Sequence, residues 1–191
     1  MSKGRLEAFS DGVIAIIITI MVLELRPPEG ASLESLGVLL PTFLSYLLSF
    51  ALLGTYWNNH HHLLQAAKVI DARVLWANLH LLFWLSLFPF GTAWVGHSNF
   101  APFPVAAYGV LLFLAGAAYF VLVRMLLRVH GQPAALAEAI GRDVKGKLSS
   151  VLFIVAIPVA LVAPAASLAI DAAVVVMWIV PDRRMERVIR S

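Results

Sequence analysis

The sequence predicts an all-α, polytopic membrane protein with six transmembrane helices. Of its 191 residues, 61% are hydrophobic and only 13% are charged, whereas about 25% of the residues in a soluble domain are charged. The apolar residues also gather into stretches of about 20, the length that an α-helix needs to cross a bilayer. We therefore expect a chain that folds within a membrane rather than around a soluble core.

We expect residues 1–191 to form one transmembrane domain, with a helix at each apolar stretch. The helices span roughly residues 6–25, 36–62, 73–96, 103–127, 148–163 and 165–181. Pro27 and Pro28 end the first helix, and Pro158 predicts a tilt or kink in the fifth. A short Ala163–Ser167 turn makes a hairpin of the last two. The first stretch resembles a secretory signal, but no small-x-small cleavage site follows it, so we expect it to be retained.

Positive charge is distributed unequally over the loops that six spans would create. Only Arg26 falls on one side of the membrane, and all other lysines and arginines fall on the opposite side. Because the side rich in lysine and arginine is cytoplasmic, we expect both termini in the cytoplasm and the protein in the cell membrane. The segment at 129–147 is expected to form a short interfacial helix whose basic residues contact anionic lipids.

Several function classes have no support in the sequence. There is no cysteine, so disulfides and thiolate metal sites are excluded. No G-x-S-x-G motif, glycine-rich phosphate loop or paired carboxylates with a base appear, so we expect no enzyme activity. Adjacent helical residues point about 100° apart, so His60, His61 and His62 cannot converge on one metal ion. We expect no metal, no other cofactor and no nucleic-acid partner.

One stripe of the first helix combines small, apolar and hydroxyl side chains. Gly12, Ile16, Thr19 and Leu23 are spaced i, i+4, i+7 and i+11, which places them on one face. In a symmetric pore they would form narrow apolar rings around a ring of hydroxyl groups, which can gate by dewetting and partly replace an ion's hydration shell. The alternative is ordinary helix packing, with Thr19 bonded to its own helix.

Charged and polar residues open the same helix, where Arg5, Ser10 and Asp11 precede a run of isoleucine and valine. A carboxylate within the bilayer costs about 2.5–3.5 kcal/mol on insertion scales, so it is expected to be paired. The cytoplasmic ends of the second and third helices offer partners at the same depth: Trp57, Asn58, His60, His61 and Asn78. Such a network would lock the first helix to its neighbours, sense protons through histidine, or be purely structural.

Asp171 interrupts the otherwise apolar second half of the chain. Only a few residues separate it from the turn before the sixth helix, which favours a position near the outer interface. A partner inside the bundle is the alternative.

Several motifs in the first half resemble a known family. Arg5-x-x-x-Phe9-Ser10-Asp11 resembles the R-x-x-x-F-S-D signature of the family of the endosomal and lysosomal potassium channel transmembrane protein 175 and its prokaryotic homologues. Trp57-x-x-His60-His61, Asn78 and Leu87-Phe88-Pro89-Phe90-Gly91-Thr92 resemble the family's second and third helices. The resemblance covers residues 5–95, and the later helices agree only in number and apolarity.

The resemblance implies an architecture and roles for individual residues. Prokaryotic members have six helices per subunit and form homotetramers, in which the first helices line a central pore without the T-V-G-Y-G filter. The apolar constriction would fall on Ile16, with Thr19 and Leu23 further out and Gly12 after the signature. Arg5, Phe9, Ser10 and Asp11 would bond to Trp57, Asn78 and either His60 or His61 and so anchor the pore helix.

The expected function is therefore a passive, potassium-permeable cation channel with modest selectivity for K⁺ over Na⁺. The animal relative also conducts protons, so H⁺ is a further candidate ion. An alternative is a proton-coupled secondary transporter that uses Asp11 and the histidines, although paired broken-helix motifs are absent. A non-conducting membrane scaffold is the third possibility.

Overall fold

The computed structural model describes residues 2–129 and 144–179, and every regular element in these ranges is a helix, which confirms the all-α prediction there. The helices are α1 (Lys3–Leu23), α2 (Leu33–Gly37), α3 (Leu40–Ala66), α4 (Ala72–Ser86), α5 (Phe88–His97), α6 (Pro102–Val129), α8 (Val144–Val162) and α9 (Pro164–Ile179). The five-residue α2 was not predicted. Its N-terminus is capped by the side chain of Ser32, which accepts a hydrogen bond from the Ser35 amide at 3.2 Å.

Five helical segments in the described ranges are long and apolar enough to cross a membrane: Lys3–Leu23, Leu40–Ala66, Ala72–His97, Pro102–Val129 and Val144–Val162. The apolar α9 is shorter, so the sixth span stays a prediction. The expected interfacial helix at 129–147 falls largely outside the described residues, although Val144–Lys147 form the first turn of α8. Helix α8 continues through Pro158.

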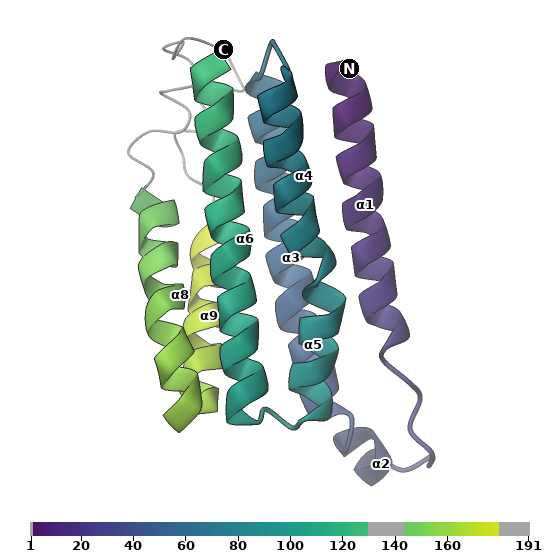
Figure 1. Ribbon diagram of the computed structural model, residues 1–191. Coiled ribbons are helices and arrows are strands. Elements are labelled where there is room, and N and C mark those ends of the chain that lie inside the picture. The colour runs from purple at the N-terminus through teal and green to yellow at the C-terminus, as the bar shows by residue number, and fades with distance from the viewer. Residues whose placement is uncertain (1, 130–143, 180–191) are drawn as a thin grey trace.

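The helices form a bundle with α1 at one edge and α8 and α9 at the opposite edge (Figure 1). Helix α6 packs against α4, α5, α8 and α9, whereas α1 contacts only one side of the bundle, formed by α3, α4 and α5. The start of α1, the turn between α3 and α4, and the end of α6 lie at the same end of the bundle (Figure 1). The first helix is therefore a peripheral element with one face available to other molecules.

The expected single helix at 73–96 is two helices, α4 and α5, which meet at Leu87. Pro89 explains the break, because proline has no N–H to continue a helical ladder but fits the first turn of a new helix. Helix α5 then packs very closely on α3. A Cβ added at Gly96 would lie 2.7 Å from the Cα of Thr42, so only glycine allows this approach without a shift.

Candidate pore helix and its anchoring network

One face of α1 anchors the helix to the rest of the subunit. Its buried residues recur every three or four positions, which is the spacing of one helical face. They are Leu6, Ser10, Ile14, Ile17 and Met21. Because α1 contacts α3, α4 and α5, this face is directed into the bundle.

The predicted stripe lies on the other side of α1. Gly12 and Thr19 are exposed, and the side chains of Ile16 and Leu23 are 59% and 76% exposed. At 100° per residue, the stripe is centred about 150° from the buried face. The stripe therefore takes no part in packing within the subunit, and in a membrane it contacts either lipid or another chain.

Thr19 presents its hydroxyl oxygen on this exposed face. Its proton is donated to the carbonyl oxygen of Ile16 in the same helix at 2.8 Å. A bond of Thr19 to its own helix is what the sequence analysis expected if the stripe served ordinary helix packing. However, a hydroxyl oxygen that donates its only proton still has two lone pairs. The side chain can therefore act as an acceptor toward a cation while its proton is satisfied by the helix.

A buried chain of hydrogen bonds links α1 to α4 and α3. His60 Nε2 lies 2.7 Å from Asn78 Oδ1, Asn78 Nδ2 donates to Ser10 Oγ at 2.9 Å, and Ser10 Oγ donates to the Leu6 carbonyl at 2.9 Å. Ser10, Asn78 and His60 are 0–1% exposed. Since the Asn78 amide nitrogen faces Ser10, its oxygen accepts from His60, which assigns the histidine proton to Nε2. His60, rather than His61, is therefore the histidine connected to the signature.

A second contact joins the signature to α3 nearer the surface of the subunit. Trp57 Nε1 donates to Asp11 Oδ1 at 2.9 Å. His61 stacks on the Trp57 indole, with ring centroids 5.9 Å apart and an interplanar angle of 23°, and its Nε2 lies 2.9 Å from the amide nitrogen of Gln65. His61 therefore supports Trp57 rather than bonding to the signature itself.

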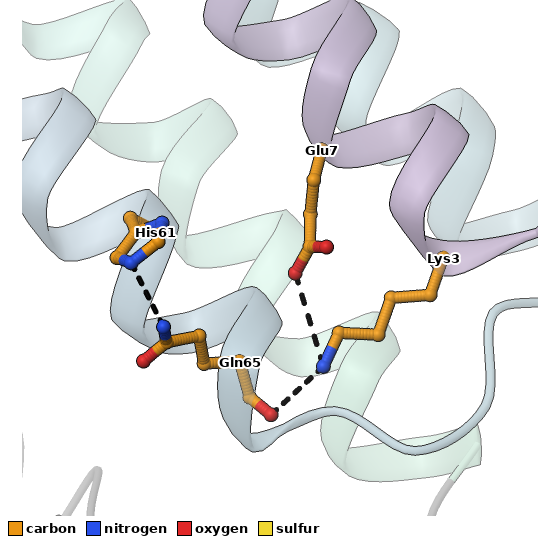
Figure 2. A network of polar contacts seen from close by, with 4 residues as sticks. All are labelled: Lys3, Glu7, His61 and Gln65. Atoms are coloured by element: carbon orange, nitrogen blue, oxygen red, sulfur yellow. Dashed lines mark hydrogen bonds and ion pairs between the residues drawn. The ribbon is translucent and has the colours of Figure 1, made fainter.

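The first turn of α1 is tied to the end of α3 by a contact that the sequence analysis missed (Figure 2). Lys3 Nζ donates to the backbone carbonyl of Gln65 at 2.9 Å and lies 3.8 Å from a carboxylate oxygen of Glu7 (Figure 2). The i, i+4 spacing of Lys3 and Glu7 was the available signal. The bond to Gln65 could not be read from the sequence, because it depends on where α3 ends.

Two signature residues do not anchor the helix within the subunit. Arg5 is exposed and Phe9 is 50% exposed, because their helical positions place them near the stripe rather than on the buried face. Among the described residues, no hydrogen bond or ion pair joins Arg5 to the network. Asn58, another expected partner, is also exposed. The expected anchoring role is thus corrected for these three residues, whereas Ser10, Asp11, Trp57, His60 and Asn78 do meet.

The described residues contain no group of three or more His, Asp or Glu side chains arranged to hold a metal ion. The three consecutive histidines diverge. His60 bonds to Asn78 and His61 to Gln65, while the buried Nδ1 of His62 has no partner among the described residues. The expectation that the protein has no metal or other cofactor stays a prediction.

Sequence comparison places this arrangement in a family. The family described as "Endosomal/lysosomal potassium channel TMEM175" matches residues 5–89, the range that holds the predicted stripe and the anchoring network. A potassium channel of Chryseobacterium sp. (strain P1-3) is 48% identical over 191 residues, which is 100% of both chains. The chain belongs to the TMEM175 family.

Other relatives place the chain within the TMEM175 family. A crystal structure of a lysosomal potassium-selective channel TMEM175 homolog from Chamaesiphon minutus has a TM-score of 0.80 and 25% identity, covering 93% of this chain and 96% of that one. The human endosomal/lysosomal proton channel TMEM175 is 38% identical over 96 residues, which cover 44% of this chain but only 19% of the human protein. Similarity to the human protein is therefore local, whereas the Chryseobacterium channel matches along the whole chain and the Chamaesiphon structure matches most of the fold.

Proposed function

We propose that the protein is a passive, potassium-permeable cation channel in which α1 lines the central pore of a homotetramer. The observation that carries the proposal is the division of α1 into an anchored face and an exposed stripe on the opposite side. The Chryseobacterium relative is named a potassium channel, and the Chamaesiphon relative a potassium-selective one. Both names support the same assignment.

The exposed stripe has the chemistry of a weakly selective pore. One α1 helix cannot enclose a path, but several copies turned toward a common axis would stack rings of Ile16, Thr19 and Leu23. The apolar rings resist wetting, and the Thr19 oxygens can replace part of the hydration shell of an ion. Because the sequence has no T-V-G-Y-G carbonyl filter, we expect only modest selectivity for K⁺ over Na⁺.

The anchoring network would fix the rotation of each pore helix. Turning α1 so that Ile16 left the axis would break the buried bond of Ser10 to Asn78 and the bond of Asp11 to Trp57. The donors and acceptors of these bonds would then lack partners, which costs about 1–3 kcal/mol for each one that is buried. The network therefore acts on conduction through geometry, without contacting the ion.

The described basic residues support a cytoplasmic location for the start of α1 and the end of α6. Apart from Arg26, they lie at or near that end of the bundle: Lys3, Arg5, Lys68, Arg73, Arg124, Arg128, Lys145 and Lys147. We take this end as cytoplasmic and the cell membrane as the location.

The decisive experiment is planar-bilayer recording of the purified protein with K⁺ on one side and Na⁺ on the other. We expect a non-saturating current whose reversal potential shows a modest preference for K⁺. Ile16→Asn should raise the current, because it adds a polar ring at the constriction. Ile154→Asn is the matched control, since Ile154 is 52% exposed but belongs to α8, at the opposite edge of the subunit (Figure 1).

Three outcomes would count against the proposal. An equal effect of Ile16→Asn and Ile154→Asn would remove Ile16 from the constriction. Saturable, proton-driven solute uptake without ohmic current would indicate the secondary transporter. A confirmed tetramer that carries no current under any condition would indicate a scaffold.

A further inference from the structure

Asp171 is a buried carboxylate without a hydrogen-bond partner among the described residues. Its side chain is 0% exposed, and neither Oδ1 nor Oδ2 is bonded. The sequence favoured a position near the outer interface, but Asp171 is turned into the bundle, and its helix α9 packs against α3, α6 and α8. Because an isolated ionised carboxylate is very unfavourable in an apolar interior, the group requires either a proton or a cation.

A chain of hydroxyl groups runs from the neighbourhood of Asp171 to the pore helix. Tyr108 lies on α6, which packs against the Asp171 helix α9, and both side chains are buried, although no hydrogen bond joins them. Tyr108 Oη lies 2.7 Å from Ser49 Oγ on α3, and Thr92 Oγ1 on α5 lies 2.6 Å from the same Ser49 oxygen. Thr92 Oγ1 is also 3.7 Å from the sulfur of Met21, on the buried face of α1. Four helices thus contribute to one polar path.

The hydrogen bonds of this chain can run in either of two directions. Each hydroxyl has one proton and so donates one hydrogen bond, which means that the donor at one end sets the direction of all the others. When Thr92 donates to Ser49, as its geometry indicates, Ser49 donates to Tyr108 and the phenolic proton is left for an outside acceptor. The reverse order requires the Ser49 and Thr92 side chains to rotate from this geometry. Tyr108 then donates to Ser49, Ser49 donates to Thr92, and Thr92 donates to the Met21 sulfur. The two orders differ at both ends of the chain.

Few titratable groups surround Asp171. Helix α6 contributes Tyr108, which also interacts with Tyr56 of α3. Within Val144–Val162, the titratable residues of α8 are Lys145 and Lys147, in its first turn, and Pro164–Ile179 contains no other titratable residue than Asp171. Among the described residues, no cationic side chain forms an ion pair or a hydrogen bond with the Asp171 carboxylate. A metal cation would need several oxygen ligands at once, whereas the nearby hydroxyls already bond to one another.

We propose that Asp171 is a proton-binding site inside each subunit, and that the Tyr108–Ser49–Thr92 chain responds to its protonation. An ionised Asp171 accepts a hydrogen bond from the Tyr108 hydroxyl, after a side-chain rotation or through one water molecule, and the phenol keeps its proton. A protonated Asp171 donates to Tyr108 instead, which reverses the chain and directs the Thr92 proton to Met21 on α1. The bound proton comes from water, and no other bond is made or broken.

The proton is observable by infrared difference spectroscopy of the full-length protein in liposomes. We expect a carboxylic-acid C=O band that disappears as the pH rises and that shifts when aspartate is labelled with carbon-13. Thermal stability should also fall as the pH rises, because ionisation leaves a buried charge without a partner. Asp171→Asn should abolish both the band and this fall. Asp71→Asn is the matched control, because Asp71 caps α4 by accepting from the Val74 amide at 2.9 Å outside the apolar core, and it should leave both unchanged.

Tyr108→Phe tests the hydroxyl chain separately. The acid band should remain but shift in frequency, because its hydrogen-bond partner is gone. An unshifted band would overturn the chain, and the absence of a carbon-13-sensitive acid band at any pH at which the protein is folded would overturn the proton site. Stability that depends on Na⁺ or K⁺ through Asp171, without an acid band, would assign a cation there instead. The measurement needs no ion flux, so it stands or falls independently of the channel function.

Discussion

The buried bond between Ser10 and Asn78 offers a quantitative test of how α1 is held. Asn78 Nδ2 donates to Ser10 Oγ at 2.9 Å, and both side chains are fully buried. Single polar contacts between membrane helices contribute about 0.6 kcal/mol on average and up to about 1.7 kcal/mol. A double-mutant cycle of Ser10→Ala and Asn78→Leu should therefore give a coupling energy of about 0.6–1.7 kcal/mol.

Each single substitution should lower the free energy of unfolding by more than the coupling energy, because each leaves a partner unpaired. Ser10→Ala leaves the Asn78 amide without its acceptor, a cost of about 1–3 kcal/mol. Asn78→Leu removes two bonds and also strands the buried Nε2–H of His60, so we expect about 2–4 kcal/mol in total. Tight packing around Asn78 adds to this value if leucine fits poorly.

Reversible unfolding in mixed micelles with increasing denaturing detergent measures these energies. Ser45→Ala is the matched control, because Ser45 is also a buried helix serine that donates to the carbonyl four residues earlier, Pro41, at 2.8 Å. Within the part of the chain that the structure describes, it accepts no bond from another helix. Its substitution should change stability by less than about 0.5 kcal/mol. A coupling of zero between Ser10 and Asn78, or equal losses for Ser10→Ala and Ser45→Ala, would refute the role of this bond.

Three further substitutions test other parts of the site. Thr19→Val removes the outward-facing oxygen without changing side-chain shape, so the K⁺ over Na⁺ permeability ratio from reversal potentials should fall toward one. Asp11→Asn keeps an acceptor for the indole but loses the charge, so unfolding should show a loss of about 1 kcal/mol with an unchanged permeability ratio. Gly96→Ala places a Cβ 2.7 Å from the Thr42 Cα and should destabilise the fold by about 1–3 kcal/mol, whereas Gly54→Ala, with nothing within 4 Å, should not.

Each of these expectations has a clear opposite. An unchanged permeability ratio in Thr19→Val would exclude its oxygen from the ion path. An Asp11→Asn variant with unchanged stability and altered selectivity would place Asp11 in that path instead of in the anchor. Equal stability of the Gly96→Ala and Gly54→Ala variants would mean that α3 and α5 separate easily.

The helices and the family could be predicted from the sequence because both depend on local patterns. Apolar stretches of membrane-spanning length identify helices regardless of how they pack. The division of the third stretch at Leu87 was missed, although Pro89 was its signal in the sequence. The partners of Ser10 and Asp11 were predicted as a set, because helices that cross a membrane in turn bring their ends to the same depth. The sequence could not show whether His60 or His61 is the partner. The two are adjacent in one helix, and only the rotation of that helix decides which of them faces Asn78.

The sequence by itself determined which residues lie together along each helix of this protein, because a helix turns by about 100° per residue whatever surrounds it. The tertiary structure alone decided which way each helix faces, because that rotation is set by contacts between helices. It turned Ser10 inward and left Ile16, Arg5 and Phe9 outside, and it buried Asp171 within the bundle. Rotation of α1 separates its anchored residues from those proposed to meet the ion.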